Sequence, residues 1–297
     1  MFRRHWFPRP KLGYDVMLMV EPIDAPCGAT VSNLNLSLDL SEEAVAELRQ
    51  SWLQHHVLVF PNQVLSPADI ERFTLSFGNF GDDPFFSPIE ENSHIAAIRR
   101  DANETTPLFA ENWHTDWSFQ AKPPIGTCLY GIKIPPVGGD TLFSNQHKAY
   151  DELPITLKNK IEHLTAIHSA ESAYSPDGVY SDKHEENVGR SMNIVVSDEA
   201  RRSQSHPFIR PHSETGALAL YSTAGYIQRF SGMEVKESKE LLQELLRYQG
   251  SSQFVYRHKW QPNMLVMWDN RSVLHKATGG YDGYDRLLHR TTISQFE

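Results

Sequence analysis

The sequence contains little cysteine. Its 297 residues include two, Cys27 and Cys128, which are isolated and form no CxxC pair. Two isolated thiols exclude a disulfide framework and a cysteine-based zinc site, and they are typical of a reducing compartment. We therefore expect the protein to be cytoplasmic.

Long apolar runs and basic runs are also missing. No stretch approaches the roughly 20 apolar residues that a membrane helix needs, and the N-terminal MFRRHWFPRPKLGYD lacks the apolar core of a signal peptide. The net charge is −9 and no basic block exceeds the pair Arg3 and Arg4, so nothing would neutralise a run of phosphates. We expect no export by that route, and neither a membrane nor a nucleic acid as a partner.

Several catalytic motifs are absent. The sequence contains no GxSxG, GxGxxG, P-loop or HExxH, which disfavours nucleophilic hydrolases, nucleotide enzymes and HExxH metalloproteases. With 40% hydrophobic and 22% charged residues, the chain has enough apolar material for a sizeable core. No interdomain linker is evident, so we predict a single domain over residues 1–297.

Helix signals are strongest near the start of the chain. Ser41 is a good N-cap ahead of two glutamates and predicts a first helix. The cap Ser66 predicts a second helix that stops at Gly78. The stretch SKELLQELLRYQG, residues 238–250, predicts a further helix that packs on the outside of the sheets.

Strand signals dominate from about residue 110 onward. Short β-rich runs are separated by Gly, Pro, Asp and Asn turns: TCLYGIKI, DTLFS, LTAIHS, GALALYS, QFVYRHKW and MLVMW. This pattern predicts a mainly β fold with flanking helices, a sandwich or jelly roll. Residues 80–112 and 172–190 lack periodicity, and such long loops are either lids over a binding site or surface insertions.

The triplet His-x-Asp/Glu occurs three times, where roughly one or two occurrences are expected by chance. His184 and His212 begin triplets in polar or turn-like segments, which we predict to be solvated surface groups. The third, His114-Thr115-Asp116, lies in ENWHTDWSF among aromatic residues. On a strand, side chains two residues apart share a face, which would present this imidazole and carboxylate together. A buried carboxylate without a partner is costly, which favours a cation there.

A metal site needs a third ligand, and the candidate is His275 in WDNRSVLHKA. Two histidines and one carboxylate on one face of an ion leave the opposite face open, the arrangement of non-haem Fe(II) oxygenases. A zinc hydrolase is a rival, but it would need a general base, and no extra glutamate stands beside the ligands. A non-catalytic β-sandwich binding module with a structural ion is a second rival, which would need a fourth protein ligand.

Two arginines occur in RLLHRTTI, which is typical of a strand. Arg286 and Arg290 share one face of that strand, where they are either exposed at an edge or bound to anions. Charge balance favours the second alternative. A ferrous ion, one aspartate and a dicarboxylate cosubstrate leave a net negative charge, which a buried arginine would neutralise with bidentate geometry. A hydroxyl donor beside the arginine would complete such a clamp.

With these residues, the chain resembles the taurine/2,4-dichlorophenoxyacetate dioxygenases (the TauD/TfdA family), which are Fe(II)- and 2-oxoglutarate-dependent enzymes with a double-stranded β-helix (jelly-roll) core. The matching stretches are NWHTDWSF, PPVGGDTLFS, MWDNRSVLHKA and DRLLHRTTI. Agreement extends from EPIDAPCGATVSNLNLS to the C-terminus. The resemblance implies that His114, Asp116 and His275 bind iron, and that Thr141 and Arg286 hold the far carboxylate of 2-oxoglutarate.

Further roles follow from the same resemblance. Arg290 is expected near the cosubstrate and near the acidic group of the primary substrate. Trp268 and Asn270 are expected to frame His275, or to serve packing and turn capping. We also expect Trp117 and Phe119 to line the substrate pocket.

Two departures from the family concern the substrate. The taurine enzymes have a His before a Pro and a Tyr shortly after it, where this chain has Asp83-Pro84 and Phe86. Trp117 stands where those enzymes have a small residue. Taurine is therefore disfavoured as the substrate. Asp83 and Phe86 are candidate substrate contacts, and Asp83 either pairs with a cationic group such as an amine or is a turn residue.

The activity that we expect is oxidation of a small, acid-bearing organic substrate with O2 and 2-oxoglutarate, with release of succinate and CO2. Hydroxylation, desaturation and oxidative cleavage would use the same residues. An amino-acid-derived substrate in a biosynthetic pathway is an alternative to a sulfonate or aryloxy acid in catabolism. A symmetric dimer is the default assembly.

Overall fold

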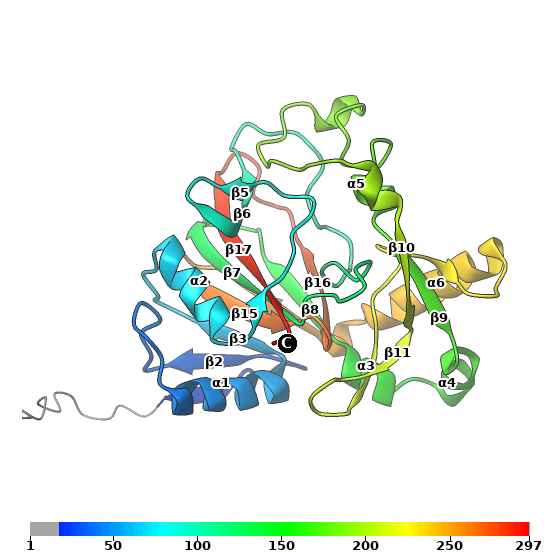
Figure 1. Cartoon of the computed structure of the whole chain (residues 1–297), viewed down its shortest axis with the longest axis horizontal. Helices are drawn as coiled ribbons and strands as arrows, with labels where there is room; N and C mark the ends of the chain where they lie inside the picture. Colours follow the sequence, from blue (N-terminus) through cyan, green and yellow to red (C-terminus); the bar gives the residue numbers. More distant parts are fainter. Residues whose placement is uncertain (1–17, 297) are drawn as a thin grey trace, which may run out of the picture.

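The computed structural model describes residues 18–296. The expectations for the N-terminal segment, including the pair Arg3 and Arg4, lie outside the described residues. A large sheet, a small sheet facing it, and a second group of strands and helices follow one another across the molecule (Figure 1).

The large sheet carries most of the framework. Its strand order is β1-β2-β3-β15-β7-β17-β6-β5, with β4 paired to β17, and all of its pairs are antiparallel except β2 with β3. Its central strands are buried on both faces, which explains the continuous apolar runs VLVF and MLVMW. The bounds are β1 (Met19–Pro22), β2 (Ala29–Ser32), β3 (Val57–Phe60), β4 (Asn79–Phe80), β5 (Pro88–Ile89), β6 (Asn92–Arg100), β7 (Gly126–Lys133), β15 (Leu265–Asp269) and β17 (Arg286–Ser294).

The small sheet has the order β14-β8-β16 and is antiparallel throughout. Its strands are β8 (Thr141–Asn145), β14 (Val255–His258) and β16 (Val273–Ala277). Phe143 of β8 and Val273 of β16 share one buried apolar cluster with Leu129, Val266 and Leu288 of the large sheet. The two sheets therefore pack face to face, and the predicted mainly β, jelly-roll fold is confirmed.

Helices α1 and α2 cover the outer face of the large sheet (Figure 1). Helix α1 (Glu42–His55) begins at the predicted cap Ser41, and α2 (Pro67–Leu75) begins at Ser66 with a complete capping box. The predicted stop of α2 at Gly78 is wrong by three residues. A Cβ on Gly78 would lie 2.1 Å from the carbonyl oxygen of Ser294, so this glycine permits a close approach to β17 rather than a cap.

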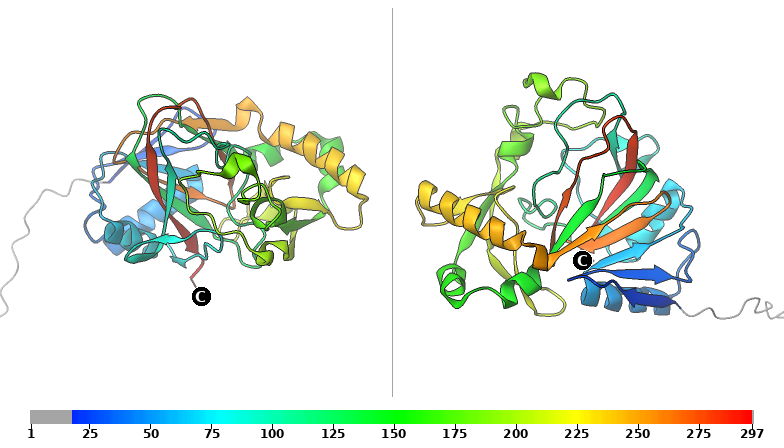
Figure 2. Two further views of the ribbon diagram at one scale, coloured as in Figure 1. Left: turned by 90° about the horizontal axis from the view of Figure 1, so that it is seen from above. Right: turned by 180° about the vertical axis from the view of Figure 1, so that it is seen from behind.

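The second group of strands and helices lies on the opposite side of the molecule, as the views in Figure 2 show. It contains a β10-β9-β13 sheet, a β11-β12 pair and the predicted outer helix α6 (Val235–Gln249), whose buried leucines pack on β13. The remaining bounds are β9 (Thr165–Ser169), β10 (Ser203–Pro207), β11 (Ile209–Pro211), β12 (Leu218–Leu220), β13 (Ile227–Phe230), α3 (Gln146–Asp151), α4 (Ile155–Ile161), α5 (Glu171–Tyr174), η1 (Glu185–Asn187), η2 (Asp198–Arg201) and η3 (Ser252–Phe254).

Two local predictions are wrong. Residues 80–112 are not one irregular segment, because β5 and the nine-residue β6 lie within them. The polar start of β6, Asn-Ser-His, hides the period of two that would have revealed it. The second error concerns ENWHTDWSF, which forms a single bridge at His114 followed by a turn from Asp116 and not a strand.

Candidate active site

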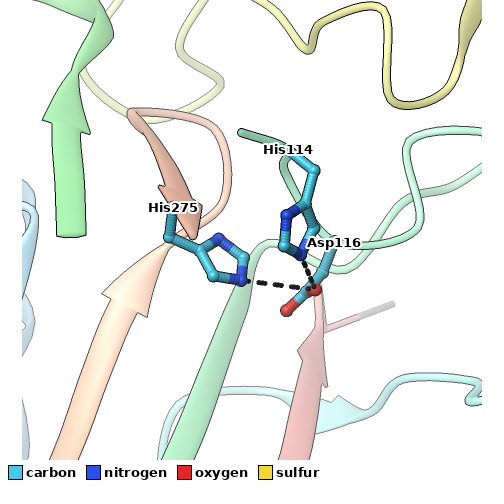
Figure 3. A group of neighbouring side chains, drawn as sticks. All are labelled: His114, Asp116 and His275. Carbon is cyan, nitrogen blue, oxygen red and sulfur yellow. Dashed lines mark ion pairs between the residues drawn. The ribbon is translucent and has the colours of Figure 1, made fainter. Parts of the chain in front are cut away.

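The three predicted metal ligands point toward one another (Figure 3). His114 and Asp116 come from the loop before β7, and His275 comes from β16. The Nε2 atoms of His114 and His275 lie 3.7 and 3.6 Å from Oδ1 of Asp116. Within residues 18–296 this is the one group of three His, Cys, Asp or Glu residues whose ligand atoms all lie within 4.8 Å of one another.

Backbone hydrogen bonds hold the two histidines side by side. The N–H of His114 donates to the carbonyl of His275 at 3.1 Å, and the N–H of His275 donates to that of His114 at 2.8 Å. Asp116 joins them through the turn, where Trp117 adopts a left-handed φ of 49°. The shared face that strand alternation predicted is therefore produced by a bridge and a turn.

The histidine rings present the nitrogens that a metal needs. Nδ1 of His114 lies 2.8 Å from the carbonyl of Asn112 and must donate to it, which leaves Nε2 unprotonated. Burial, and then the neighbouring His114, lowers the pKa of His275 to about 3, and burial lowers the pKa of His114. Burial opposes ionisation of Asp116, but His275, Arg290 and His114 outweigh it and lower the pKa of that carboxyl. Neutral imidazoles and an ionised carboxylate are the forms that bind metals.

A buried chain of hydrogen bonds orients Asp116. Thr127 donates to its Oδ2 at 2.6 Å, Asn270 donates to Thr127 at 2.9 Å, and Trp268 donates to Asn270 at 2.9 Å. Asn270 therefore acts on Asp116 through Thr127, and Trp268 also packs on His275 with ring centroids 4.7 Å apart. Sequence reasoning missed Thr127, whose signal is its place in β7 on the same face as Leu129, which lines the pocket.

The turn that carries Asn270 is fixed by charge. Asp269 is fully buried, accepts from His212 at 2.9 Å and pairs with Arg271 at 2.7 Å. Although burial opposes its ionisation, Arg271 and His212 hold the pKa of Asp269 far below its usual range. The prediction that His212 is a solvated surface group is therefore wrong, because β11 ends beside this turn. His184 is exposed, as predicted.

Arg286 is a buried cation with no carboxylate partner in the described chain. Its side chain is 6% exposed, Nη2 donates to the carbonyl of Gly139 at 3.2 Å, and Nε has no hydrogen-bond partner. Burial lowers its pKa, although an arginine stays protonated. Gly139, at a φ of 68°, leaves room for the guanidinium, since a Cβ there would lie 3.2 Å from Nε.

Thr141, the first residue of β8, lines the same pocket as Arg286, Arg290 and the three ligands. Its hydroxyl accepts from Trp260 at 3.0 Å, which leaves the hydroxyl proton free to donate. Apolar residues of the same pocket wall are Ile98, Leu129, Met192, Trp268 and Ala277. Sequence reasoning missed Arg100, Glu104, Arg190 and Tyr281, which also line it.

Arg290 differs from Arg286 because the protein supplies its partner. Nη2 of Arg290 pairs with Oδ1 of Asp83 at 2.7 Å, and the indole N–H of Trp117 donates to the same oxygen. The cation beside Asp83 in the structure is therefore Arg290 of the chain itself. Asp83, Phe86, Trp117 and Phe119 do not line the pocket that holds the ligands.

These side chains belong instead to an aromatic cluster behind Arg290. Phe86 and Trp117 lie 4.6 and 5.0 Å from the guanidinium carbon, and Phe119 packs on Trp117 at 5.5 Å. Trp117 and Phe119 therefore lie in this cluster and are not among the residues that line the pocket, because the left-handed turn at Trp117 directs its ring into the cluster.

A second pocket touches His114 from the other side. Its wall includes Tyr174, Tyr180, Tyr226 and Phe109, and it shares Phe109, Ala110 and His114 with the first pocket. Sequence reasoning did not find these tyrosines, although Tyr174 and Tyr180 lie in the segment 172–190 that it marked as a candidate lid.

Comparison with known proteins agrees with this site. A family model described as taurine catabolism dioxygenase TauD, TfdA family, matches residues 19–292. The chain is 31% identical to an alpha-ketoglutarate-dependent 2,4-dichlorophenoxyacetate dioxygenase from Cupriavidus pinatubonensis, over 93% of this chain and 97% of that protein. The chain belongs to the TauD/TfdA family of dioxygenases.

Two other TauD/TfdA relatives show the breadth of the family. Pentalenolactone F synthase from Streptomyces avermitilis is 30% identical over 91% of each chain. The crystal structure of a taurine dioxygenase from Burkholderia xenovorans superposes with a TM-score of 0.76 at 26% identity and covers 94% of this chain and 91% of that one. The protein is thus an Fe(II)- and 2-oxoglutarate-dependent dioxygenase. This membership disfavours both the zinc hydrolase and the binding module with a structural ion.

Proposed function

We propose that His114, Asp116 and His275 hold the iron, and that Thr141 and Arg286 bind the far carboxylate of 2-oxoglutarate. The observation that carries this proposal is Arg286. It is a buried charge without a counterion in the described chain, and such a charge is costly unless a ligand brings the anion. Thr141 adds a hydroxyl donor in the same pocket.

The residues around the iron site supply position and charge. Bound iron supplies the O2 chemistry that is coupled to decarboxylation of 2-oxoglutarate to succinate and CO2. Thr127 and Asn270 fix the carboxylate of Asp116, and the carbonyl of Asn112 fixes the ring of His114. The apolar wall excludes water from the reacting face. Whether the product is hydroxylated, desaturated or cleaved then depends on the substrate. The same residues would serve a substrate from a biosynthetic or a catabolic pathway.

We further propose that residues 80–112 and 172–190 act together as a lid of a single domain spanning residues 1–297. The two segments are hydrogen-bonded to each other: Ala110 donates to the hydroxyl of Tyr180 at 3.4 Å, and Arg190 donates to the carbonyl of Pro107 at 3.1 Å. Just beyond the second segment, the backbone N–H of Ser191 donates to Glu104 at 3.0 Å. These contacts lie beside both pockets, because Ala110, Glu104, Tyr180 and Arg190 are among the lining residues.

The location of the protein is proposed from its cysteines. Both cysteines are free and buried, which supports a reducing compartment such as the cytoplasm. No helix among residues 18–296 is long and apolar enough to cross a membrane. A symmetric dimer stays a prediction.

Anaerobic addition of Fe(II) and 2-oxoglutarate tests the proposal. The wild type should develop a weak visible charge-transfer band, and His114→Ala and Arg286→Ala should lose it. His184→Ala and Arg202→Ala are matched controls at exposed positions and should keep the band. An unchanged band in His114→Ala and Arg286→Ala would show that the assignment of these residues is wrong.

A further inference from the structure

Arg290, which also lines the pocket, already has a carboxylate partner within the protein. Its guanidinium forms an ion pair with Asp83 at 2.7 Å and packs against the rings of both Phe86 and Trp117. Asp83 is compensated in turn, since Arg290 and the indole of Trp117 both donate to its Oδ1. The pair is neutral as a whole, so it offers no net charge to a substrate.

Asp83 is held in place by its surroundings. The carbonyl of Asp83 accepts from the N–H of Phe86 at 3.4 Å, and the carbonyl of Phe85 accepts from Val195 at 2.9 Å. Phe85 stacks on Tyr174 with ring centroids 4.7 Å apart. A carboxylate anchored in this way on a proline-containing turn does not yield its partner easily to a ligand from solution.

Charge balance points in the same direction. A ferrous ion, the carboxylate of Asp116, a dicarboxylate cosubstrate and Arg286 sum to zero, and Arg290 with Asp83 sums to zero as well. Arg100 is paired with Glu104, but Arg190, which also lines this pocket, forms no ion pair among the described residues and stands outside this sum. An anionic substrate that does not contact Arg190 would therefore add an uncompensated charge, which is strongly unfavourable.

The second pocket gives independent support. It reaches His114, and the described residues of its wall include no aspartate, glutamate, lysine or arginine. Tyr174, Tyr180 and Tyr226 provide aromatic faces, and Asn112 and Ser172 provide neutral polar groups. A wall of this kind binds apolar and aromatic molecules and fixes their orientation with neutral hydrogen bonds.

From these observations, and resting on the function proposed above, we propose that the primary substrate is an uncharged, largely apolar molecule that binds the tyrosine-lined pocket, and that Asp83 acts as a built-in counterion that excludes acid-bearing substrates from Arg290. This proposal differs from the expectation of an acid-bearing substrate that was drawn from the sequence. Asp83 is a specificity-determining residue under this proposal, because it acts on the substrate through Arg290.

Arg190 is the one competing site for an acid group. It lines the first pocket and forms no ion pair among the described residues, although it donates to Pro107 and Asn187 and packs on Tyr180. It lies on the lid segment rather than in the second pocket. An acid-bearing substrate that used Arg190 would contradict the proposal, so the experiment includes this residue.

Titration calorimetry on the anaerobic Fe(II)- and 2-oxoglutarate-loaded protein tests the proposal with two matched probes, phenoxyacetate and 2-phenoxyethanol. In the wild type we expect the neutral probe to bind about tenfold or more tightly than the anion, since an unpaired buried charge is penalised by at least that factor. Equal or tighter binding of phenoxyacetate would overturn the proposal. Loss of such binding in Arg190→Gln would assign the acid site to Arg190.

The variant Asp83→Asn, with Asp82→Asn as the matched control at an exposed neighbouring position, decides the role of the counterion. Asp83→Asn should gain about tenfold or more in affinity for phenoxyacetate and keep its affinity for 2-phenoxyethanol, while Asp82→Asn should behave as wild type. If Asp83→Asn binds phenoxyacetate no more tightly than the wild type does, the proposal is overturned. This holds also if neither probe binds the wild type.

A second measurement covers the case in which Asp83→Asn does not fold. The thermal midpoint of Asp83→Ala should rise when sodium acetate replaces sodium chloride, because acetate supplies the missing carboxylate to Arg290, and Asp82→Ala should show no such rise. Equal midpoints in both salts would overturn the proposal. Absence of the visible band in the wild type would instead contradict the iron and 2-oxoglutarate assignment, so the two failures are distinguishable.

Discussion

Two arginines on one face of β17, four residues apart in the sequence, have opposite environments. Arg286 has no carboxylate partner in the described chain and its pKa is lowered by burial. Arg290 is equally buried, but Asp83 and Asp116 outweigh that burial and raise its pKa. The comparison teaches that a buried charge serves a ligand where its counterion is missing and serves the fold where the counterion is supplied.

Removing Arg290, the arginine that is paired with Asp83, should have the largest effect on stability. We expect Arg290→Leu to lower the free energy of unfolding by about 3–5 kcal/mol, because Asp83 is left as a buried, unpaired charge. The double variant Asp83→Leu/Arg290→Leu should recover most of that loss. Urea unfolding of the two single variants and the double variant measures the coupling, and additive losses would contradict the pairing.

Removing Arg286, the arginine without a carboxylate partner in the described chain, should weaken the binding of 2-oxoglutarate instead. We expect Arg286→Gln to weaken 2-oxoglutarate binding by about 2–5 kcal/mol, with a free energy of unfolding equal to or above that of the wild type in the absence of 2-oxoglutarate. Calorimetric titration of 2-oxoglutarate and urea unfolding give the two values. A stability loss as large as that of Arg290→Leu would remove the distinction between the two arginines.

A smaller effect is expected when the hydrogen bond from Thr127 to Asp116 is removed, and it concerns the affinity for the metal. Thr127→Val keeps the shape of the side chain but removes the donor to Oδ2 of Asp116. We expect Fe(II) affinity to fall about 10–100-fold, with 2-oxoglutarate binding to Arg286 affected through the metal alone. Competition with a chelator measures the metal affinity. Thr74→Val, whose buried hydroxyl donates to the carbonyl of Ile70 at 2.8 Å within α2, is the control that should leave it near wild type.

A pH titration tests a buried histidine that lies outside the arginine comparison. Burial lowers the pKa of His258 to about 4 from 6.5. The unfolded chain therefore takes up a proton below pH 6.5 that the folded chain refuses until about pH 4, so stability present above 6.5 is lost between these values. Between these pH values, we expect the free energy of unfolding of His258→Leu to fall by about 1–3 kcal/mol less than that of the wild type. Urea unfolding at several pH values checks it, and parallel curves for wild type and His258→Leu would contradict it.

The framework of the fold was predictable because local signals agree with tertiary packing. Ser41 and Ser66 cap the first two helices, and the apolar runs VLVF and MLVMW became buried central strands. Strand β6 was not predictable, because its polar first half carries no period of two. Gly78 was predicted to end the helix because a glycine is typical both of a helix end and of a place where two backbone segments lie close together. At Gly78 the second reason applies.

The candidate site divides in the same way. The triad and Arg286 could be inferred because metals and dicarboxylates demand particular residue types. The partner of Asp83 could not, since Arg290 lies more than two hundred residues away in the sequence, and no local pattern records which of two arginines has a counterion. Trp117 was expected in the pocket from the resemblance to the family, but a left-handed turn governs the direction of its ring.

The reciprocal backbone bridge between His114 and His275 has a consequence for metal exchange. Two of the three ligands are tethered by main-chain bonds that need no ion, so the chain entropy of assembling the site is largely spent during folding. Iron can then leave and return without unravelling the protein, and empty enzyme should stay ready for reloading after a turnover that ends in oxidised metal.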